Sequence, residues 1–221
     1  MPAAPDPARA VRLVLFDLDG TLIDSEAGIT GSMAHALRAL EVEPPPIEVL
    51  RGWIGPPLQA SFPSVLGDDV ERVDLAVRHY LERFEAVGWR EHTVYPGIAE
   101  LLAALRERGD RLAVVTSKII GQARRIVGHL PFGHLFDGVF GPELGVRTSE
   151  KAALVGQAMR ELGGTALQTR MIGDRRFDIE GARASGVRGI GVLWGFGQAA
   201  ELREAGADHI VAKPDELLEC L

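Results

Sequence analysis

The sequence predicts an α/β protein with a parallel β-sheet, helices on both faces of the sheet, and a mostly helical insertion. Short apolar runs alternate with helical patterns over most of the chain, which is typical of parallel strands connected through helices. The stretch 24–95 breaks this alternation, because it contains helical patterns but no convincing strand. We therefore expect an α/β core formed by residues 11–23 and 96–221, with a helical cap of residues 24–95 inserted into it.

The expected strands share a short apolar run that ends at polar or turn-forming residues. They cover residues 11–16, 112–115, 139–140, 170–172, 189–193 and 209–211. Helical patterns between them cover residues 98–108, 121–130, 150–162, 179–184 and 199–205. In the insertion, helical patterns cover 25–40 and 68–87, with proline-rich breaks at 44–46 and 55–57. An alternative is that the insertion is simply more helical core.

The composition is that of an ordinary soluble globular protein, with 46% hydrophobic and 25% charged residues. A net charge of −7 argues against a nucleic-acid partner, since such binding relies on Lys and Arg. A single cysteine, Cys220, excludes an intrachain disulfide. The longest uncharged stretch, 189–200, is too short to span a bilayer, and residues 1–10 are expected to be a disordered leader. These features favour a cytoplasmic protein without a membrane partner and leave its oligomeric state open.

The first candidate site follows the first expected strand and reads Asp17-Leu18-Asp19-Gly20-Thr21. Open parallel sheets bind ligands beyond the carboxyl ends of their strands, so these acids stand where chemistry is expected. Two carboxylates this close repel each other unless a cation or proton lies between them. Gly20 allows a sharp turn that brings backbone N–H groups near an anion. Calcium loops also contain the Asp-x-Asp-Gly pattern, so alone it leaves both readings open.

Two further candidates are weaker. Thr116-Ser117-Lys118 follows the second expected strand of the core, where a hydroxyl suits a phosphate oxygen but also an ordinary helix cap. Lys151 stands at the start of an expected helix, where a cation opposes the helix dipole unless an anion lies nearby. A surface lysine paired with Glu150 is the alternative for that position.

The fourth candidate, Gly173-Asp174-Arg175-Arg176-Phe177-Asp178, again follows an expected strand. Its two carboxylates are one helical turn apart and should meet Asp17 and Asp19 at one edge of the sheet. Such a cluster is costly without a hard cation, and oxygen ligands select Mg²⁺. Four independent helix caps are the alternative reading.

With these motifs in this order, the chain resembles the haloacid dehalogenase-like hydrolases, in the phosphoglycolate phosphatase and 5′-nucleotidase-like branch with a helical cap. The resemblance covers essentially all of the sequence after the first ten residues. It implies a Rossmann-like core and a small-molecule phosphate ester as the substrate. It also implies that Mg²⁺ is the cofactor.

The resemblance assigns a role to each carboxylate. Asp17 would be the nucleophile that forms an aspartyl-phosphate and would also bind Mg²⁺. Asp19 would protonate the leaving oxygen and then activate water, while its backbone carbonyl binds the metal. Asp174 would be a metal ligand, and Asp178 would lie in or next to the coordination shell.

The remaining motif residues would handle the phosphoryl group. Thr116, helped by backbone N–H groups near Gly20 and Ser117, would hold phosphoryl oxygens. Lys151 would offset the charge of the nucleophile and the phosphate. Phosphoryl transfer depends mainly on positioning and charge neutralisation, which these roles provide.

Asp19 separates two branches of the family. A halide leaves without a proton, whereas an alkoxide leaving from a phosphate ester benefits from a positioned acid. The chain therefore resembles the phosphatases, with a phosphomutase and a catalytically silent binding module as alternatives. Two residues depart from the common family pattern, namely Ala152 after Lys151 and Arg175 after Asp174. They leave the substrate open between phosphoglycolate and a nucleoside 5′-monophosphate.

The helical insertion is expected to close over the site and exclude water. Arg51 and Gln59 flank a Gly-Pro-Pro turn in it and are candidates for contacting the non-phosphate end of the substrate. A solvated surface arginine is the alternative for Arg51.

Overall fold

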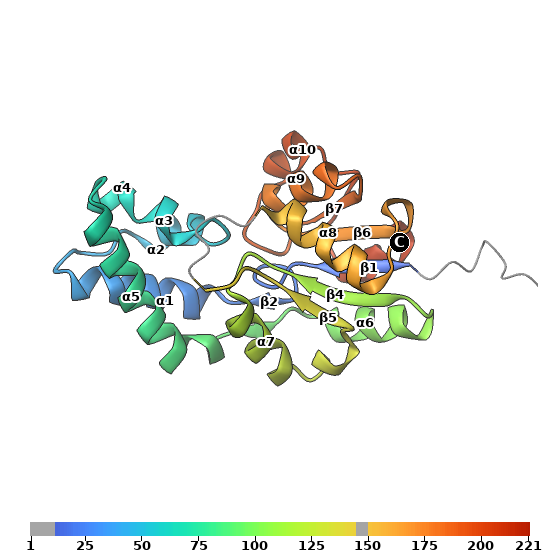
Figure 1. Ribbon diagram of the computed structural model, residues 1–221, viewed down its shortest axis with the longest axis horizontal. Helices are drawn as coiled ribbons and strands as arrows, with labels where there is room; N and C mark the ends of the chain where they lie inside the picture. Colours follow the sequence, from blue (N-terminus) through green and yellow to red (C-terminus); the bar gives the residue numbers. More distant parts are fainter. Residues whose placement is uncertain (1–11, 145–149) are drawn as a thin grey trace, which may run out of the picture.

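A computed structural model of the protein describes residues 12–144 and 150–221, so that the expected leader lies outside the described residues. In Figure 1 the sheet with its helices forms the right part of the molecule, and the helices of the insertion form the left part. The sheet has six parallel strands in the order β5-β4-β1-β6-β7-β8. Their bounds are β1 Leu13–Phe16, β4 Arg111–Val115, β5 Gly138–Phe140, β6 Thr169–Gly173, β7 Arg188–Val192 and β8 His209–Val211. The predicted parallel α/β core is confirmed.

The register of the three central strands places their carboxyl ends level with one another. Phe16, the last residue of β1, pairs with Val114 of β4 and Ile172 of β6. The residues that follow β1, β4 and β6 therefore leave the sheet at the same edge. This alignment brings the separate sequence motifs into one place.

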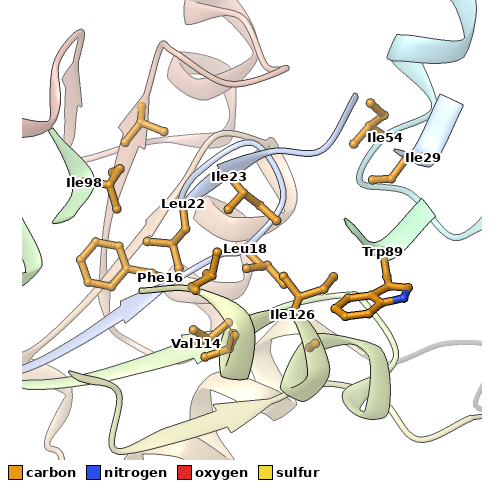
Figure 2. Close-up of a cluster of buried hydrophobic side chains, with 14 of the residues drawn as sticks. Phe16, Leu18, Leu22, Ile23, Ile29, Ile54, Trp89, Ile98, Val114 and Ile126 are labelled. Atoms are coloured by element: carbon orange, nitrogen blue, oxygen red, sulfur yellow. The ribbon is translucent and has the colours of Figure 1, made fainter. Parts of the chain in front are cut away.

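Helices cover both faces of the sheet, as the alternation of strands and helices predicts. Even-numbered residues of β1 and β4, such as Phe16 and Val114, join the core cluster under α6 and α7 (Figure 2). Odd-numbered residues, such as Leu15 and Ala113, face α8 and α9 instead. The helices are α6 Ile98–Glu107, α7 Ile120–His129, α8 Lys151–Leu162, α9 Arg176–Ala184, α10 Ala199–Ala205 and α11 Leu217–Cys220. Short 3-10 helices cover Gly88–Arg90, Gly133–Leu135, Ala166–Gln168 and Pro214–Glu216.

The insertion contains two long helices that pack on each other and three short ones between them. Their bounds are α1 Glu26–Ala39, α2 Ile47–Gly52, α3 Leu58–Ser61, α4 Pro63–Leu66 and α5 Val70–Ala86. The proline-rich breaks at 44–46 and 55–57 lie outside helices, as predicted. The three short helices were not predicted; α2 and α3 begin directly after these breaks, and α4 begins at Pro63, which is compatible with a first helical turn. The division of the chain into core and cap at residues 23/24 and 95/96 stays a prediction.

One difference from the expectation is a two-stranded antiparallel ribbon where the chain enters and leaves the insertion. It consists of β2 Ile23–Asp24 and β3 Thr93–Val94. Strands of two residues are too short to produce a periodic pattern in the sequence, so the expectation of no strand in this stretch was wrong. A second difference is that α9 starts at Arg176, three residues earlier than predicted, because Asp178 accepts a hydrogen bond from the Arg175 N–H.

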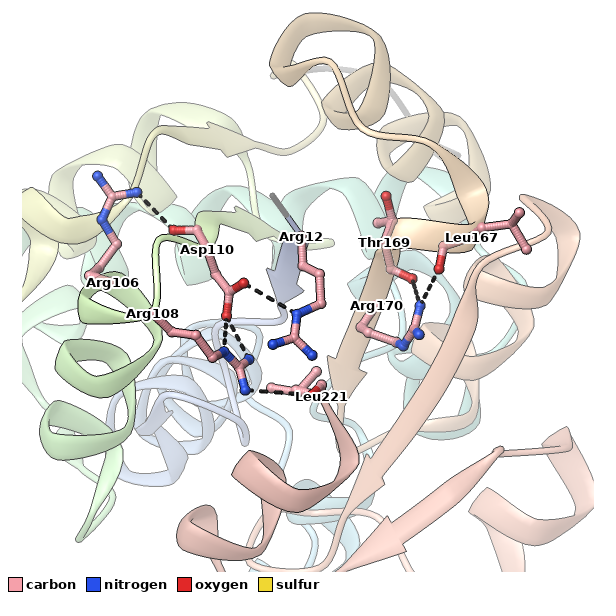
Figure 3. A network of polar contacts seen from close by, with 8 residues as sticks. All are labelled: Arg12, Arg106, Arg108, Asp110, Leu167, Thr169, Arg170 and Leu221. Carbon is pink, nitrogen blue, oxygen red and sulfur yellow. Dashed lines mark hydrogen bonds and ion pairs between the residues drawn. The ribbon is translucent and has the colours of Figure 1, made fainter. Parts of the chain in front are cut away.

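At the amino-terminal ends of β1 and β4, a buried aspartate connects segments that are distant in the sequence (Figure 3). Asp110, just before β4, lies 3.3 Å from the Nε of Arg12 and accepts a 2.6 Å hydrogen bond from the Nε of Arg108. It lies far from the strands' carboxyl ends, so its role is structural. No helix in the described residues is both long and apolar enough to cross a lipid bilayer.

Candidate active site

A cavity of about 830 Å³ lies between the carboxyl ends of the central strands and the insertion. The core contributes Asp17, Asp19, Thr116, Ser117 and Lys151 to its wall. The insertion contributes mainly apolar side chains, namely Ile29, Met33, Trp53, Ile54, Leu58, Val77, Tyr80 and Leu81. The cavity therefore has a polar floor and a largely apolar roof.

Lys151 is the centre of the ion pairs on the floor. Its Nζ lies 2.8 Å from Asp17 Oδ1 and 2.7 Å from Asp178 Oδ1, and all three side chains are buried. Helix α8 can approach α9 this closely because Gly181 lacks a side chain, since a Cβ there would lie 2.7 Å from the Cβ of Lys151. The ion pairs exclude the alternative that Lys151 is a surface lysine.

The protonation of these groups is controlled by burial and by their neighbours. Burial raises the pKa of Asp17 to about 7, with the charge of Asp178 adding to this and the ammonium of Lys151 opposing it. Burial acts to lower the pKa of Lys151, but the carboxylates of Asp17 and Asp178 outweigh it, and the pKa is raised. Lys151 is thus a permanent cation next to an unusually basic carboxylate.

Asp174 is fully buried behind Gly20. Its carboxylate accepts hydrogen bonds from the Thr21 hydroxyl at 3.3 Å and from the Phe196 N–H at 2.8 Å. Gly20 has φ +85°, and a Cβ there would lie 2.4 Å from Asp174 Oδ2, so only glycine fits. Burial, followed by the charges of Asp178 and Asp17, raises the pKa of Asp174 well above its ordinary value.

The three carboxylates fit a hard cation. Asp17, Asp174 and Asp178 each offer a ligand atom, and these atoms lie within 4.8 Å of one another. Burial and mutual repulsion disfavour the charged form of these carboxylates, and Lys151 offsets only part of this free-energy cost. A divalent ion with oxygen ligands would remove the remainder. Three of the four predicted acids thus form a cluster that could hold a metal ion, and the Asp19 carboxylate is not part of it.

Asp178 also has a structural role. Its Oδ2 accepts a 3.1 Å hydrogen bond from the backbone N–H of Arg175, at the start of α9. Asp178 thus caps helix α9 through Oδ2 and pairs with Lys151 through Oδ1.

Asp19 is paired with a lysine to which the sequence reading gave no role. Lys118 Nζ lies 3.1 Å from Asp19 Oδ2, and the two side chains are 6% and 12% exposed. Asp19 Oδ1 is buried and has no hydrogen-bond partner in the described part of the chain. The Thr116 hydroxyl accepts a 3.2 Å hydrogen bond from the Lys118 N–H and so fixes the turn after β4.

The two candidates from the insertion differ in position. Gln59 lines the cavity. Arg51 is not among the residues of the cavity wall, and 52% of its side chain is exposed. Its Nε lies 3.2 Å from Glu26 Oε2, and its guanidinium lies 5.8 Å from the centroid of the Phe196 ring. The expectation that Arg51 contacts the substrate therefore has no support in this geometry.

A contact that the sequence reading missed joins the core to the insertion. Arg175 donates a hydrogen bond from Nη1 to the backbone carbonyl of Ile54, and its Nε lies 2.9 Å from Glu201 Oε1. Arg175 also lines the cavity. Arg175, which departs from the common family pattern, thus links the loop after β6 to the insertion.

Sequence comparison identifies the family of the chain. The model of the haloacid dehalogenase-like hydrolase family matches residues 14–192. A protein of Pseudomonas aeruginosa named 5′-nucleotidase is 43% identical over 199 residues, which are 90% of each chain. Tyrosine-protein kinase PtkA of Mycobacterium tuberculosis is 34% identical over 221 residues, covering 99% of this chain and 75% of the kinase. A phosphoglycolate phosphatase of Pseudomonas fluorescens is 29% identical over 211 residues, covering 93% and 78%.

Structure comparison agrees. The crystal structure of a predicted phosphatase from Clostridium acetobutylicum superimposes with a TM-score of 0.89 and 37% identity, covering 96% of this chain and 98% of that one. The similarity includes the sheet and the helical insertion together, because almost the whole of both chains is matched.

Proposed function

The chain belongs to the haloacid dehalogenase-like hydrolases, and from this premise we propose that it is a Mg²⁺-dependent phosphatase that hydrolyses phosphomonoesters through an aspartyl-phosphate on Asp17. One observation carries the proposal. Asp17, Asp174 and Asp178 form a buried carboxylate cluster, with Asp17 on the cavity wall and Lys151 bound to two of the three. In its charged form such a cluster favours a bound cation, and that cation would also bind the oxygens of a phosphate ester.

In the first step, an Asp17 carboxylate oxygen attacks phosphorus and forms an O–P bond. The P–O bond to the alcohol breaks, and Asp19, in its protonated form, donates its proton to the leaving oxygen. Thr116, Ser117 and the turn at Gly20 supply donors to the phosphoryl oxygens. Lys151 keeps the nucleophile oriented and offsets the charge that gathers around it.

In the second step, the Asp19 carboxylate takes a proton from water as the water oxygen attacks the same phosphorus. The bond between phosphorus and Asp17 breaks, which releases inorganic phosphate and restores the Asp17 carboxylate. Asp19 ends the cycle protonated, as it began, so protons and bonds balance over the two steps.

Mg²⁺ held by Asp17, Asp174 and Asp178, with the Asp19 carbonyl, would neutralise charge between the carboxylates and the phosphoryl oxygens. This chain's own residues prepare for it by keeping the acids buried and close together. Gly20 does so by leaving room for the Asp174 carboxylate.

For the substrate, two observations favour a nucleotide-sized phosphomonoester over phosphoglycolate. The cavity of about 830 Å³ is in the range of sites that enclose a drug-sized molecule. The apolar side chains from the insertion suit a ring system better than a second small anion. We therefore propose nucleoside 5′-monophosphates ahead of phosphoglycolate, in line with the name of the 43% identical relative.

Asp17→Asn tests the chemistry. The neutral amide is a poor nucleophile, so Mg²⁺-dependent release of phosphate should fall to background, and no phosphoenzyme should be trapped by rapid acid quench. Asp68→Asn, at an exposed acid outside the cavity, is the matched control and should behave as the wild type. Undiminished turnover in excess EDTA, or a fully active Asp17→Asn protein, would refute the mechanism.

A substrate panel tests the selectivity. It compares nucleoside 5′-monophosphates, phosphoglycolate, and ATP with a tyrosine-containing acceptor peptide, the last because one relative is named a kinase. We expect kcat/KM to be highest for the nucleotides. We also expect the phosphate to be released as inorganic phosphate rather than transferred to the tyrosine of the peptide. A preference for phosphoglycolate would overturn the substrate proposal and leave the chemistry intact.

A further inference from the structure

Lys118 is a cavity-lining lysine that the mechanism above does not use. Its Nζ lies 3.1 Å from Asp19 Oδ2, and only 6% of its side chain is exposed. The other lysine of the described cavity wall, Lys151, binds Asp17 and Asp178 instead. The acids of the site are thus divided between two cations, one for the nucleophile and one for Asp19.

The two oxygens of the Asp19 carboxylate have different surroundings. Oδ2 is held by Lys118, whereas Oδ1 is buried without a hydrogen-bond partner in the described ranges. A buried unpaired carboxylate oxygen is costly, unless a ligand supplies the missing donor. The ester oxygen and the attacking water of the proposed reaction are both groups that share a proton with this carboxylate.

The Lys118 ammonium also contacts the insertion. Its Nζ lies 4.3 Å from the centroid of the Phe84 ring, which belongs to α5 and is buried. Phe84 is itself stacked on Tyr80 with the ring centroids 5.6 Å apart and the planes at 10°. Helix α5 therefore supports the lysine through a cation–π contact, which favours one position of the ammonium.

We propose that Lys118 is a positioning residue: it holds Asp19 Oδ2 so that Oδ1 is presented to the leaving oxygen and then to water. Because Phe84 supports the ammonium, the position of α5 sets the position of the acid. The inference rests on the acid–base role proposed for Asp19. It differs from a phosphate-binding role, in which Lys118 would act on phosphoryl oxygens and not through Asp19.

The test uses two aromatic substrates that differ in their need for a proton. p-Nitrophenolate leaves without protonation, whereas the alkoxide of 2-phenylethyl phosphate needs it. kcat/KM covers the steps up to the release of the alcohol, so it reports this protonation. In Lys118→Met, we expect kcat/KM for the phenylethyl ester to fall by roughly 10–100-fold, and the value for the nitrophenyl ester to fall several times less.

Three further proteins complete the test. Lys213→Met, at an exposed lysine outside the cavity, should match the wild type on both substrates. Lys118→Arg keeps a cation that can pair with Asp19 and stack on Phe84, so it should retain most of the activity on the phenylethyl ester. Asp19→Asn should show the same leaving-group dependence as Lys118→Met, and the double variant should lose no more than Asp19→Asn alone, since both act through one carboxylate.

Equal losses on both substrates in Lys118→Met would overturn the inference, because a phosphate-binding or purely structural lysine has that effect. An additive double variant would overturn it as well. If Lys118→Met does not fold, Phe84→Leu removes the ring under the ammonium and should give the same pattern at a smaller size; equal losses there would also overturn the inference. If Asp19→Asn itself shows no leaving-group dependence, the proposed role of Asp19 fails and the role of Lys118 fails with it.

Discussion

The raised pKa of Asp17 predicts an unusual pH dependence of stability in the metal-free protein. In the unfolded chain this carboxyl titrates near 3.8, whereas burial raises its pKa to about 7 in the folded state, against the opposing charge of Lys151. Between these two values the folded protein binds more protons than the unfolded one. The free energy of unfolding should therefore fall as the pH rises from about 4 to about 7, the reverse of the usual behaviour of a carboxylate.

The size of the effect follows from the distance between the two pKa values. One pKa unit corresponds to about 1.4 kcal/mol, so a rise from 3.8 to about 7 gives roughly 4 kcal/mol as an upper bound. Other groups titrate in the same range, and a difference between two proteins removes their contribution. The useful quantity is the free energy of unfolding of the wild type minus that of Asp17→Asn.

The measurement is urea unfolding in EDTA from pH 4 to pH 8, followed by circular dichroism. The difference between the wild type and Asp17→Asn should fall steadily with rising pH by up to about 4 kcal/mol. Excess Mg²⁺ should abolish most of this slope, since a bound cation favours the charged carboxylate. A difference that is independent of pH in EDTA would mean that Asp17 is not held in a desolvated, charge-crowded site, and would refute the electrostatic argument for the metal.

Two further outcomes concern the insertion. Arg175→Met removes the contacts with the Ile54 carbonyl and Glu201, so cap closure should weaken and kcat/KM should fall by roughly tenfold. Arg176→Met, at the exposed neighbouring residue, should have little effect on kcat/KM. Steady-state kinetics of both variants tests this, and equal effects would contradict the link between Arg175 and the insertion. Arg51→Ala should change kcat/KM for phosphoglycolate and p-nitrophenyl phosphate by the same small factor, because the Arg51 guanidinium pairs with Glu26 outside the cavity wall. A loss of kcat/KM for phosphoglycolate alone would instead support a role of Arg51 in binding a second anionic group.

The sheet core was predictable because its signal is local and repeated. Each strand is a short apolar run, and each candidate motif directly follows one. Parallel strands in register end at one edge, so the convergence of the residues after Phe16, Val115 and Gly173 follows from topology alone. Placing the acids together therefore needed no knowledge of side-chain contacts.

The parts that could not be predicted depend on contacts between distant segments. Arg51 stands beside a Gly-Pro-Pro turn, but the pairing with Glu26 follows from how α1 and α2 pack. Lys118 was visible in the sequence, yet which carboxylate it pairs with depends on the turn that Thr116 fixes and on the approach of Phe84 from α5. Neither contact has a spacing that a sequence pattern can reveal.

The distribution of cations over the acids supports the proposal that the site binds a metal ion in addition to its two lysines. Lys151 forms ion pairs with Asp17 and Asp178, and Lys118 forms one with Asp19. Asp174 has, among the described residues, the neutral hydrogen-bond donors Thr21 and Phe196, although it is fully buried.

Burial, followed by the charges of Asp178 and Asp17, raises the pKa of Asp174, because neutral donors do not compensate a buried negative charge in full. Its ligand atom lies within 4.8 Å of those of Asp17 and Asp178, and the absence of a side chain at Gly20 leaves room for the carboxylate. A divalent ion bound by the three carboxylates would stabilise all of them at once. We therefore expect the two lysines to orient the proposed nucleophile and the proposed acid, and the buried carboxylate of Asp174 to favour binding of the proposed metal ion.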